Sequence, residues 1–135
     1  MLDAWVLDSY AVLALLQGEP GAEDVVKQIE AAQQGRSRVL MTWVNVGEVL
    51  YTIERRRGSD SVPQVLGLLE ASAVSFVDVD RSLALMAASI KANHALAYAD
   101  AFAAALAMRE DAPLMTGDPE FGQLEDQVSI HWLGA

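Results

Sequence analysis

Four acidic residues lie inside hydrophobic segments of this 135-residue chain, each at a point where an apolar run meets a helix or a turn. They are Asp8, Glu48, Asp100 and Asp118. Carboxylates are ordinarily solvated, and burying one costs free energy unless a partner compensates for the lost water. Any fold of this chain must therefore give these four positions a compensating partner. The simplest partner that all four can share is a divalent metal ion.

Short β-type runs alternate with segments of helical periodicity along the chain. We expect strands at residues 4–7, 38–41, 74–77, 113–116 and 128–132. We expect helices at residues 9–16, 22–34, 43–57 with Thr42 as N-cap, 61–71, 81–93 with Asp80 as cap, and 97–109. Because parallel neighbours need crossover connections, this alternation predicts an α/β fold with three layers. A mainly parallel sheet of about five short strands would carry helices on both faces.

The chain is the size of one domain, and its 53% hydrophobic composition is enough to close a core. We therefore expect a single domain over residues 1–135. Four aromatic residues are assigned to its core: Trp5, Phe76, Phe102 and Trp132. Trp43 and Tyr51 could form an exposed interaction patch around the second acid, but their helical spacing favours the core for them as well.

The residue inventory excludes several kinds of chemistry. The sequence has no cysteine and two histidines, which rules out disulfides and thiolate chemistry and disfavours a Ser–His triad. Oxygen-only ligands favour Mg²⁺ or Mn²⁺ over zinc. No apolar run approaches the roughly 20 residues that span a bilayer, and the N-terminus lacks the basic residues of a signal peptide. We expect a cytoplasmic protein without a membrane partner.

The formal charge of −10 argues against general affinity for nucleic acid, which is normally held by a surplus of Lys and Arg. It does not exclude a nuclease, because bound cations would offset the metal-binding acids. Arg55, Arg56 and Arg57 are consecutive and form a candidate RNA-binding patch. The alternative is a solvated helix C-terminus, where cations complement the helix dipole.

The expected positions of the four acids are consistent with one site. Asp8 and Asp118 follow predicted strands, and ligands of parallel sheets bind at the C-terminal ends of the strands. Asp100 and Glu48 could reach that edge from nearby helices, although the helix dipole alone would also explain an acid in a first turn, as at Asp100. Carboxylates held this close together repel, so the cluster predicts raised pKa values in the metal-free protein.

Four segments together resemble a known family. They are residues 6–12 (VLDSYAV), 46–51 (VGEVLY), 96–101 (LAYADA) and 116–121 (TGDPEF). In this order and spacing they resemble the motifs of PIN-domain ribonucleases, most of all the VapC-type toxins of prokaryotic toxin–antitoxin pairs. The resemblance covers nearly the whole chain.

The resemblance implies a Mg²⁺-dependent endoribonuclease, with Mn²⁺ able to substitute, in which a metal-activated water hydrolyses RNA phosphodiester bonds. It implies Asp8 and Asp100 as the firmest ligands, Glu48 next, and Asp118 through water. Thr116 and Ser9 are expected to act as hydroxyl donors behind the ligands, although Ser9 reads equally well as a helix cap. Glu120 is expected to be solvated rather than a fifth ligand.

The resemblance also implies a cognate antitoxin protein and a homodimer, besides the RNA substrate. Two alternatives remain open at this point. One is a catalytically silent PIN-like binding module. The other is a Mg²⁺-dependent phosphoacceptor of the receiver or dehalogenase type, which fits less well because the dehalogenase pattern needs a second Asp where this chain has Tyr10.

Overall fold

The structure is a computed structural model that describes residues 2–134, and it is built around a parallel sheet. The sheet has five strands in the order β3-β2-β1-β4-β5. The strands are β1 (Asp3–Leu7), β2 (Ser37–Thr42), β3 (Val74–Val77), β4 (Leu114–Thr116) and β5 (Ile130–Trp132). This arrangement confirms the predicted α/β class and shows that every strand pairing is parallel.

Six α-helices and one 3-10 helix connect the strands within the described residues. They are α1 (Ser9–Gln17), α2 (Ala22–Gln33), α3 (Trp43–Arg57), α4 (Ser61–Ala71), α5 (Arg81–Asn93), α6 (Tyr98–Glu110) and η1 (Pro119–Leu124). The ends of the six α-helices lie within about two residues of the predicted ones, because caps and breakers mark most of them. η1 is not among the predicted helices. Among residues 2–134, no helix is both long and apolar enough to cross a bilayer.

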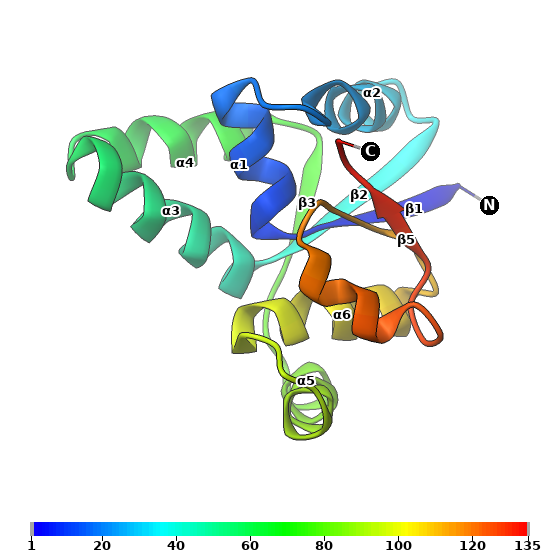
Figure 1. Cartoon of the computed structure of the whole chain (residues 1–135). Coiled ribbons are helices and arrows are strands. Elements are labelled where there is room, and N and C mark those ends of the chain that lie inside the picture. The colour runs from blue at the N-terminus through cyan, green and yellow to red at the C-terminus, as the bar shows by residue number, and fades with distance from the viewer. Residues whose placement is uncertain (1, 135) are drawn as a thin grey trace.

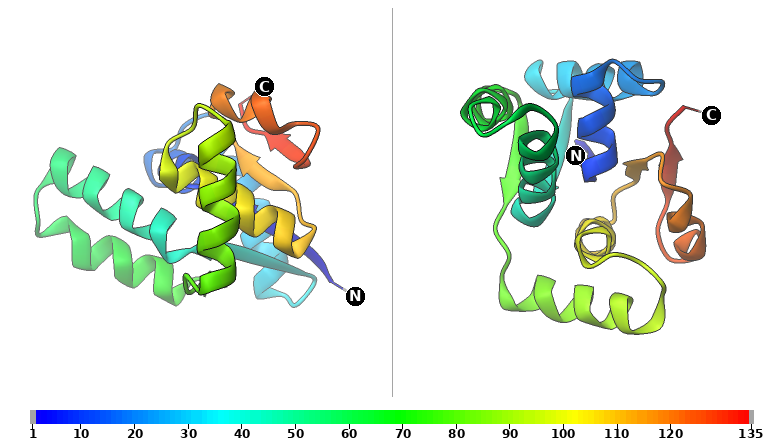
Figure 2. Two further views of the ribbon diagram at one scale, coloured as in Figure 1. Left: turned by 90° about the horizontal axis from the view of Figure 1, so that it is seen from below. Right: turned by 60° about the vertical axis from the view of Figure 1, so that its left-hand side comes forward.

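The two faces of the sheet pack against separate hydrophobic cores because successive strand residues point to opposite sides. Val6 and Leu114 contact the core formed with α5 and α6, whereas Leu7 and Met115 contact the core formed with α1 to α4. Figures 1 and 2 show α6 against the sheet, with α5 crossing it on the outer side. The result is the predicted three-layer arrangement.

Polar side chains set the directions in which α1, α3 and α5 leave the sheet. Asp8, Thr42 and Asp80 are their N-caps, and each accepts a hydrogen bond from the backbone N–H three residues later. Such a cap satisfies one of the amides that the first turn leaves unpaired. The predicted caps at Thr42 and Asp80 are confirmed. For Ser9, the cap interpretation is wrong, because the preceding Asp8 caps the helix.

The prediction for the aromatic residues is partly wrong. Phe102 is buried, but Trp5, Phe76 and Trp132 only border the cores and stay partly exposed. Trp43 and Tyr51 have exposed fractions of 36% and 48%, so neither is a core residue. Helical spacing places residues on one face of a helix but does not determine whether that face is covered. In α3, the part of the helix surface that carries Trp43 and Tyr51 is open to solvent.

Candidate metal centre

The acidic residues gather where the order of the strands reverses. The chain fills β1, β2 and β3 on one side and then returns to place β4 on the other side of β1. A crevice forms outside the C-terminal ends of the strands at such a switch point. Figure 1 shows the starts of α1, α3, α6 and η1 converging there. Asp8 follows β1, Asp118 follows β4, and Asp100 lies in the first turn of α6.

Asp8 is almost completely buried, with 1% of its surface exposed. Its Oδ1 accepts a hydrogen bond from the Ala11 N–H over 2.8 Å, and its Oδ2 accepts one from the Thr116 hydroxyl. The Thr116 Oγ1 in turn accepts from the Asp118 N–H over 3.1 Å. Burial raises the pKa of Asp8 to about 7, despite the opposing effect of these hydrogen bonds, and the charges of Asp100 and Asp118 add to the rise.

Asp100 is 8% exposed, and its pKa is also raised to about 7. Burial is the main cause, followed by the charges of Asp118, Glu48 and Glu120. A helix N-terminus acting alone would lower the pKa of a carboxyl in the first turn. The opposite direction means that burial and neighbouring acids outweigh the dipole, so the dipole does not account for the environment of Asp100.

Three carboxylates form the tightest group: Asp100, Asp118 and Glu120 each offer an oxygen within 4.8 Å of the others. Glu120 is exposed, as the sequence predicts, yet η1 turns its carboxylate back toward Asp100. It is therefore a candidate ligand that sequence reasoning left out. Asp8 and Glu48 lie outside this tight group. The charge of Glu48 raises the pKa of Asp100, and the charges of Asp100 and Asp118 raise the pKa of Asp8.

Glu48 lies on α3, is partly buried, and accepts a hydrogen bond at its Oε2 from the Tyr51 hydroxyl over 3.3 Å. The charge of Glu48 is the main reason that the pKa of Tyr51 is raised. The phenol therefore stays protonated at neutral pH and remains a donor to the carboxylate.

No Lys or Arg in residues 2–134 forms an ion pair with any of the five acids. The ion pairs that the structure contains lie elsewhere: Arg38–Glu110, Arg109–Asp80 and His131–Asp24. A group of carboxylates without basic partners is unfavourable unless protons or cations neutralise it. The donor set is oxygen only and partly buried, which fits Mg²⁺ or Mn²⁺.

Asn45 is a structural residue of this region that sequence reasoning missed. It is fully buried, and its Nδ2 donates to Ser9 Oγ over 3.4 Å and to the Ala99 carbonyl over 3.0 Å. The Ser9 hydroxyl donates back to the Asn45 carbonyl over 3.2 Å. Asn45 thereby joins α3 to the starts of α1 and α6, which carry acids. The only sequence signal is one amide within the apolar segment WVNV.

Arg55, Arg56 and Arg57 are exposed and occupy the last turn of α3. The Arg55 guanidinium carbon lies 4.8 Å from the centroid of the Tyr51 ring. The three positions fit both of the alternatives left open by the sequence, since they complement the helix dipole and are also free to contact an anion.

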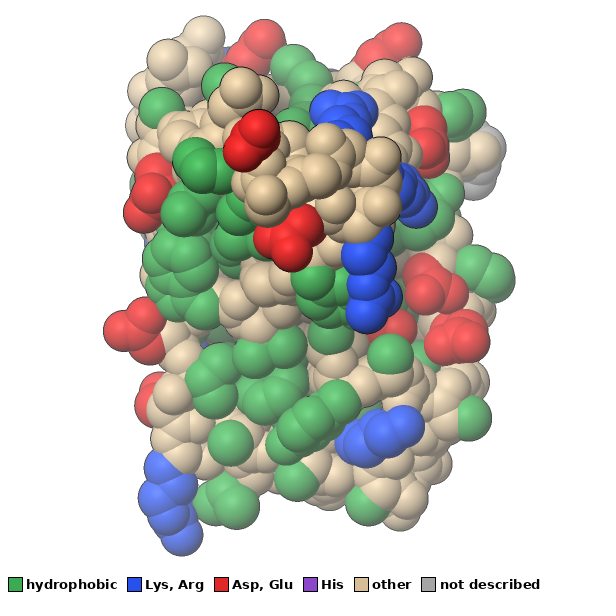
Figure 3. All heavy atoms as spheres, turned by 90° about the vertical axis from the view of Figure 1, so that its left-hand side faces the viewer, with side chains coloured by type: hydrophobic (Ala, Val, Ile, Leu, Met, Phe, Trp, Pro, Cys, Tyr) green, Lys and Arg blue, Asp and Glu red, His purple; other side chains and the backbone are tan. Residues whose placement is uncertain are grey.

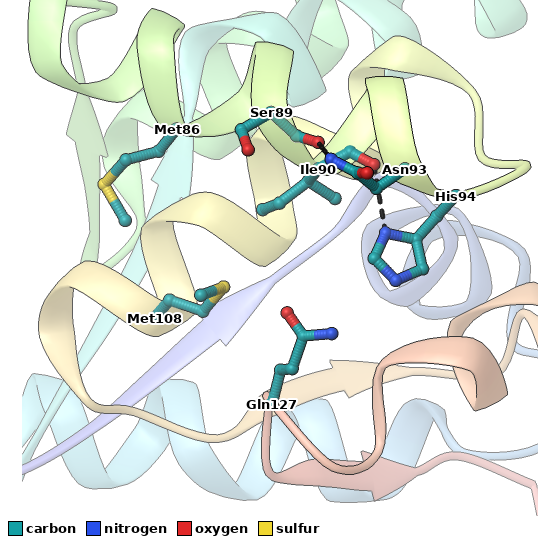
Figure 4. Close-up of a pocket in the computed structure, with 7 residues that line it drawn as sticks. All are labelled: Met86, Ser89, Ile90, Asn93, His94, Met108 and Gln127. Carbon is teal, nitrogen blue, oxygen red and sulfur yellow. Dashed lines mark hydrogen bonds between the residues drawn. The ribbon is translucent and has the colours of Figure 1, made fainter.

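A hollow of about 360 Å³ lies between α5, α6 and the segment after η1, away from the acids (Figure 4). Its lining includes Met86, Met108 and Gln127. Its polar rim is already engaged, because the His94 Nδ1 lies 3.1 Å from the Ile90 carbonyl and the Asn93 amide donates to the Ser89 carbonyl. None of its lining residues is one of the clustered acids, so it is not the candidate centre.

Solved structures share this fold. The VapBC2 complex of Rickettsia felis, bound to a DNA fragment from its promoter, aligns with a TM-score of 0.73 and 12% identity over 96% of this chain and 98% of that chain. DNA-bound VapBC from Salmonella typhimurium aligns with a TM-score of 0.73 and 16% identity over 97% and 98%. VapC20 of Mycobacterium tuberculosis, described as a Sarcin-Ricin loop cleaving toxin, aligns with a TM-score of 0.70 and 16% identity over 88% of this chain and 93% of that chain.

No curated protein matches the sequence. The family model described as PIN domain, in contrast, matches residues 5–127, which include all of the clustered acids. This match spans most of the chain, and it agrees with the parallel sheet and with the acids at its switch point. The chain belongs to the PIN domain family.

Proposed function

We propose that this protein is a Mg²⁺-dependent endoribonuclease that acts as the toxin of a toxin–antitoxin pair. The observation that carries the proposal is the gathering of Asp8, Glu48, Asp100 and Asp118 at one sheet edge without a basic partner among the described residues. Family membership and the likeness to VapC20, described as a toxin that cleaves the Sarcin-Ricin loop, support it.

Asp8 and Asp100 would hold the metal, with Glu48 and Asp118 completing the set. Glu120 would be an additional ligand, because it offers an oxygen within 4.8 Å of oxygens of Asp100 and Asp118. When bound, Mg²⁺ or Mn²⁺ supplies a Lewis acid for the phosphodiester and lowers the pKa of water. Thr116 fixes the Asp8 carboxylate and the Asp118 backbone through one hydroxyl. Burial raises the pKa of Asp8 while no metal is bound, and a bound cation would favour its ionised form.

Arg55, Arg56 and Arg57 would contact RNA phosphates, since they form a compact exposed basic group in an acidic protein. Figure 3 views the molecule from the side of α3 and α4, where hydrophobic side chains cover much of the surface and basic side chains lie in a row. Exposed hydrophobic residues include Trp43 and Leu68. Such surface suits protein partners, here a cognate antitoxin and a second copy of the chain, in the cytoplasm.

The proposal is tested by incubating purified protein with total small RNA in Mg²⁺, Mn²⁺ or EDTA. We expect discrete products that need metal and that disappear in Asp8→Asn and Asp100→Asn. Asp80→Asn is the matched control, because this acid also begins a helix but lies outside the cluster. RNA that is bound yet uncut by the wild type under every metal condition would reject the nuclease and favour the silent binding module.

A further inference from the structure

One face of α3 connects the candidate metal centre to the basic end of that helix. Glu48, Tyr51 and Arg55 are spaced three and four residues apart, so they lie on the same side of the helix, each about one turn from the next. Tyr51 contacts both of the others, because its hydroxyl donates to Glu48 Oε2 and its ring faces the Arg55 guanidinium. Tyr51 therefore lies between Glu48 of the acidic cluster and Arg55 of the basic group and contacts both.

Each contact restricts a side chain that would otherwise have several rotamers. The hydroxyl–carboxylate distance of 3.3 Å is long for an O–H···O bond, so this bond is weak, but it gives the Glu48 carboxylate a fixed partner. In residues 2–134 it is the only hydrogen bond that the Glu48 side chain makes, which leaves Oε1 available. The distance of 4.8 Å from guanidinium carbon to ring centroid lies within the range of a cation–π contact, which limits where Arg55 can point.

We propose that Tyr51 is a positioning residue with two roles. Its hydroxyl holds the Glu48 carboxylate in the orientation used at the metal centre, and its ring holds Arg55 where an RNA strand approaches that centre. Arg55 lies seven residues beyond Glu48, which is about 10 Å along the helix axis. A strand that reaches the acids along α3 therefore meets Arg55 first. The inference rests on the proposed nuclease function and adds the path by which the substrate enters.

Tyr98 provides a matched comparison. Its exposed fraction is 48%, the same as that of Tyr51. Its ring packs at 4.7 Å from the ring of Phe102, and its hydroxyl makes no hydrogen bond within the described part of the chain. Exposure of a tyrosine is therefore not enough to produce the Tyr51 arrangement. Tyr98→Phe therefore removes a tyrosine hydroxyl without removing a hydrogen bond to another described residue.

The hydroxyl role is tested by calorimetric titration of Mn²⁺ into the metal-free protein, without RNA. We expect the Kd for Mn²⁺ to rise about three- to tenfold in Tyr51→Phe and to stay unchanged in Tyr98→Phe. Equal Kd values for the wild type and Tyr51→Phe would overturn this role. Because the titration needs no RNA, it gives an answer even if the wild type binds metal but cleaves nothing, a result that would reject only the proposed function.

The ring role is tested by the binding of a fluorescent single-stranded RNA, with Asp8→Asn as the background to prevent cleavage. We expect Tyr51→Leu and Arg55→Gln each to weaken binding about three- to tenfold and to flatten its salt dependence, while Tyr51→Phe binds like its parent. Combining Tyr51→Leu with Arg55→Gln should add little to Arg55→Gln alone, because both act through one guanidinium.

The RNA experiment has a control variant and a control for folding. Arg81→Gln removes an exposed cation at the start of α5, outside the α3 face, and should leave binding unchanged. Circular dichroism of each variant confirms that it is folded before binding is measured. Unaltered RNA affinity in folded Tyr51→Leu, or fully additive losses in the double variant, would overturn the positioning of Arg55 by the ring.

Discussion

Asp8 and Asp80 occupy the same local structure in two different regions of the molecule. Both are N-caps in extended backbone, with φ and ψ of −94° and −177° for Asp8 and −100° and 179° for Asp80. Each accepts the N–H of the residue three positions later over 2.8 Å. Yet the pKa of Asp8 is raised to about 7, whereas the pKa of Asp80 is lowered.

The difference comes from the surroundings rather than from the cap. Asp8 is buried and faces other acids, whereas the Asp80 side chain is 58% exposed and pairs with Arg109 at 3.2 Å. The capping bond is the main cause of the lowered pKa of Asp80, and the same bond at Asp8 is outweighed by burial. A cap thus explains why an Asp begins each helix, but only the cluster explains the electrostatics of Asp8.

The largest expected effect is a difference in the rate of RNA cleavage between variants of these two aspartates. Asp8→Asn keeps an acceptor for the Ala11 N–H but removes a charge from the centre, so RNA cleavage should fall about 100-fold or more. Asp80→Asn should cleave at the wild-type rate. Initial rates on the same RNA at saturating Mg²⁺ measure both. Comparable losses in the two variants would mean that the cap, not the cluster, matters for activity.

The second effect is on stability without metal. Between about pH 4 and pH 7, native Asp8 keeps a proton that the unfolded chain has released, so the free energy of unfolding falls as the pH rises through this interval. Asp100 contributes in the same direction. Asp8→Asn should make the decline shallower and stabilise the metal-free protein at pH 7 by about 1 to 3 kcal/mol. Urea unfolding in EDTA at several pH values tests this, and parallel curves would contradict it.

A third effect tests the hydroxyl that supports Asp8. Thr116→Val removes the hydrogen bond that opposes the rise in the pKa of Asp8 and leaves the partly buried Asp118 N–H without its acceptor. We expect a loss of about 1 to 2 kcal/mol in unfolding free energy and about tenfold weaker Mn²⁺ binding at pH 7. The weakening should shrink at higher pH, where Asp8 ionises again. A Kd ratio that is independent of pH would disprove this linkage.

The smallest effect is expected at Asp80. Because its pKa is lowered, its ionised form contributes stability at pH values above the ordinary carboxyl pKa, and this contribution disappears as the pH falls. Asp80→Asn should therefore lower the thermal midpoint slightly at pH 7 and hardly at all at pH 3. This pH dependence has the opposite sign to that of Asp8→Asn. A thermal scan at the two pH values distinguishes the signs.

Most secondary structure was predictable because its signals are local. The helices at Ser61–Ala71 and Arg81–Asn93 and the strand at Val74–Val77 match the predicted bounds. The last strand begins at Ile130 rather than at residue 128, because the preceding residues continue the turn after η1. The strand order was not predictable from periodicity, since it depends on how the two cores close around the sheet.

The acids of the site were identifiable, but their arrangement was not. The role of Asn45 was not predictable because the partners through which it joins α1 and α6 lie 36 and 54 residues away along the chain. The approach of Glu120 to Asp100 depends on the turn at the start of η1, which residue type alone does not specify. The exposure of Tyr51 was also missed, because an amphipathic pattern gives no information on which part of a helix projects beyond its neighbours.

The hydrogen bond between Thr116 and Asp8 joins residues 108 positions apart, and β1 lies beside β4 at the centre of the sheet. A chain that grows on the ribosome from its N-terminus therefore contains Asp8, Glu48 and Asp100 before β4 exists to complete their surroundings. A nascent or truncated product that stops before residue 114 carries three of the acids without the assembled centre. The order of synthesis thus delays the complete site until the chain is nearly finished.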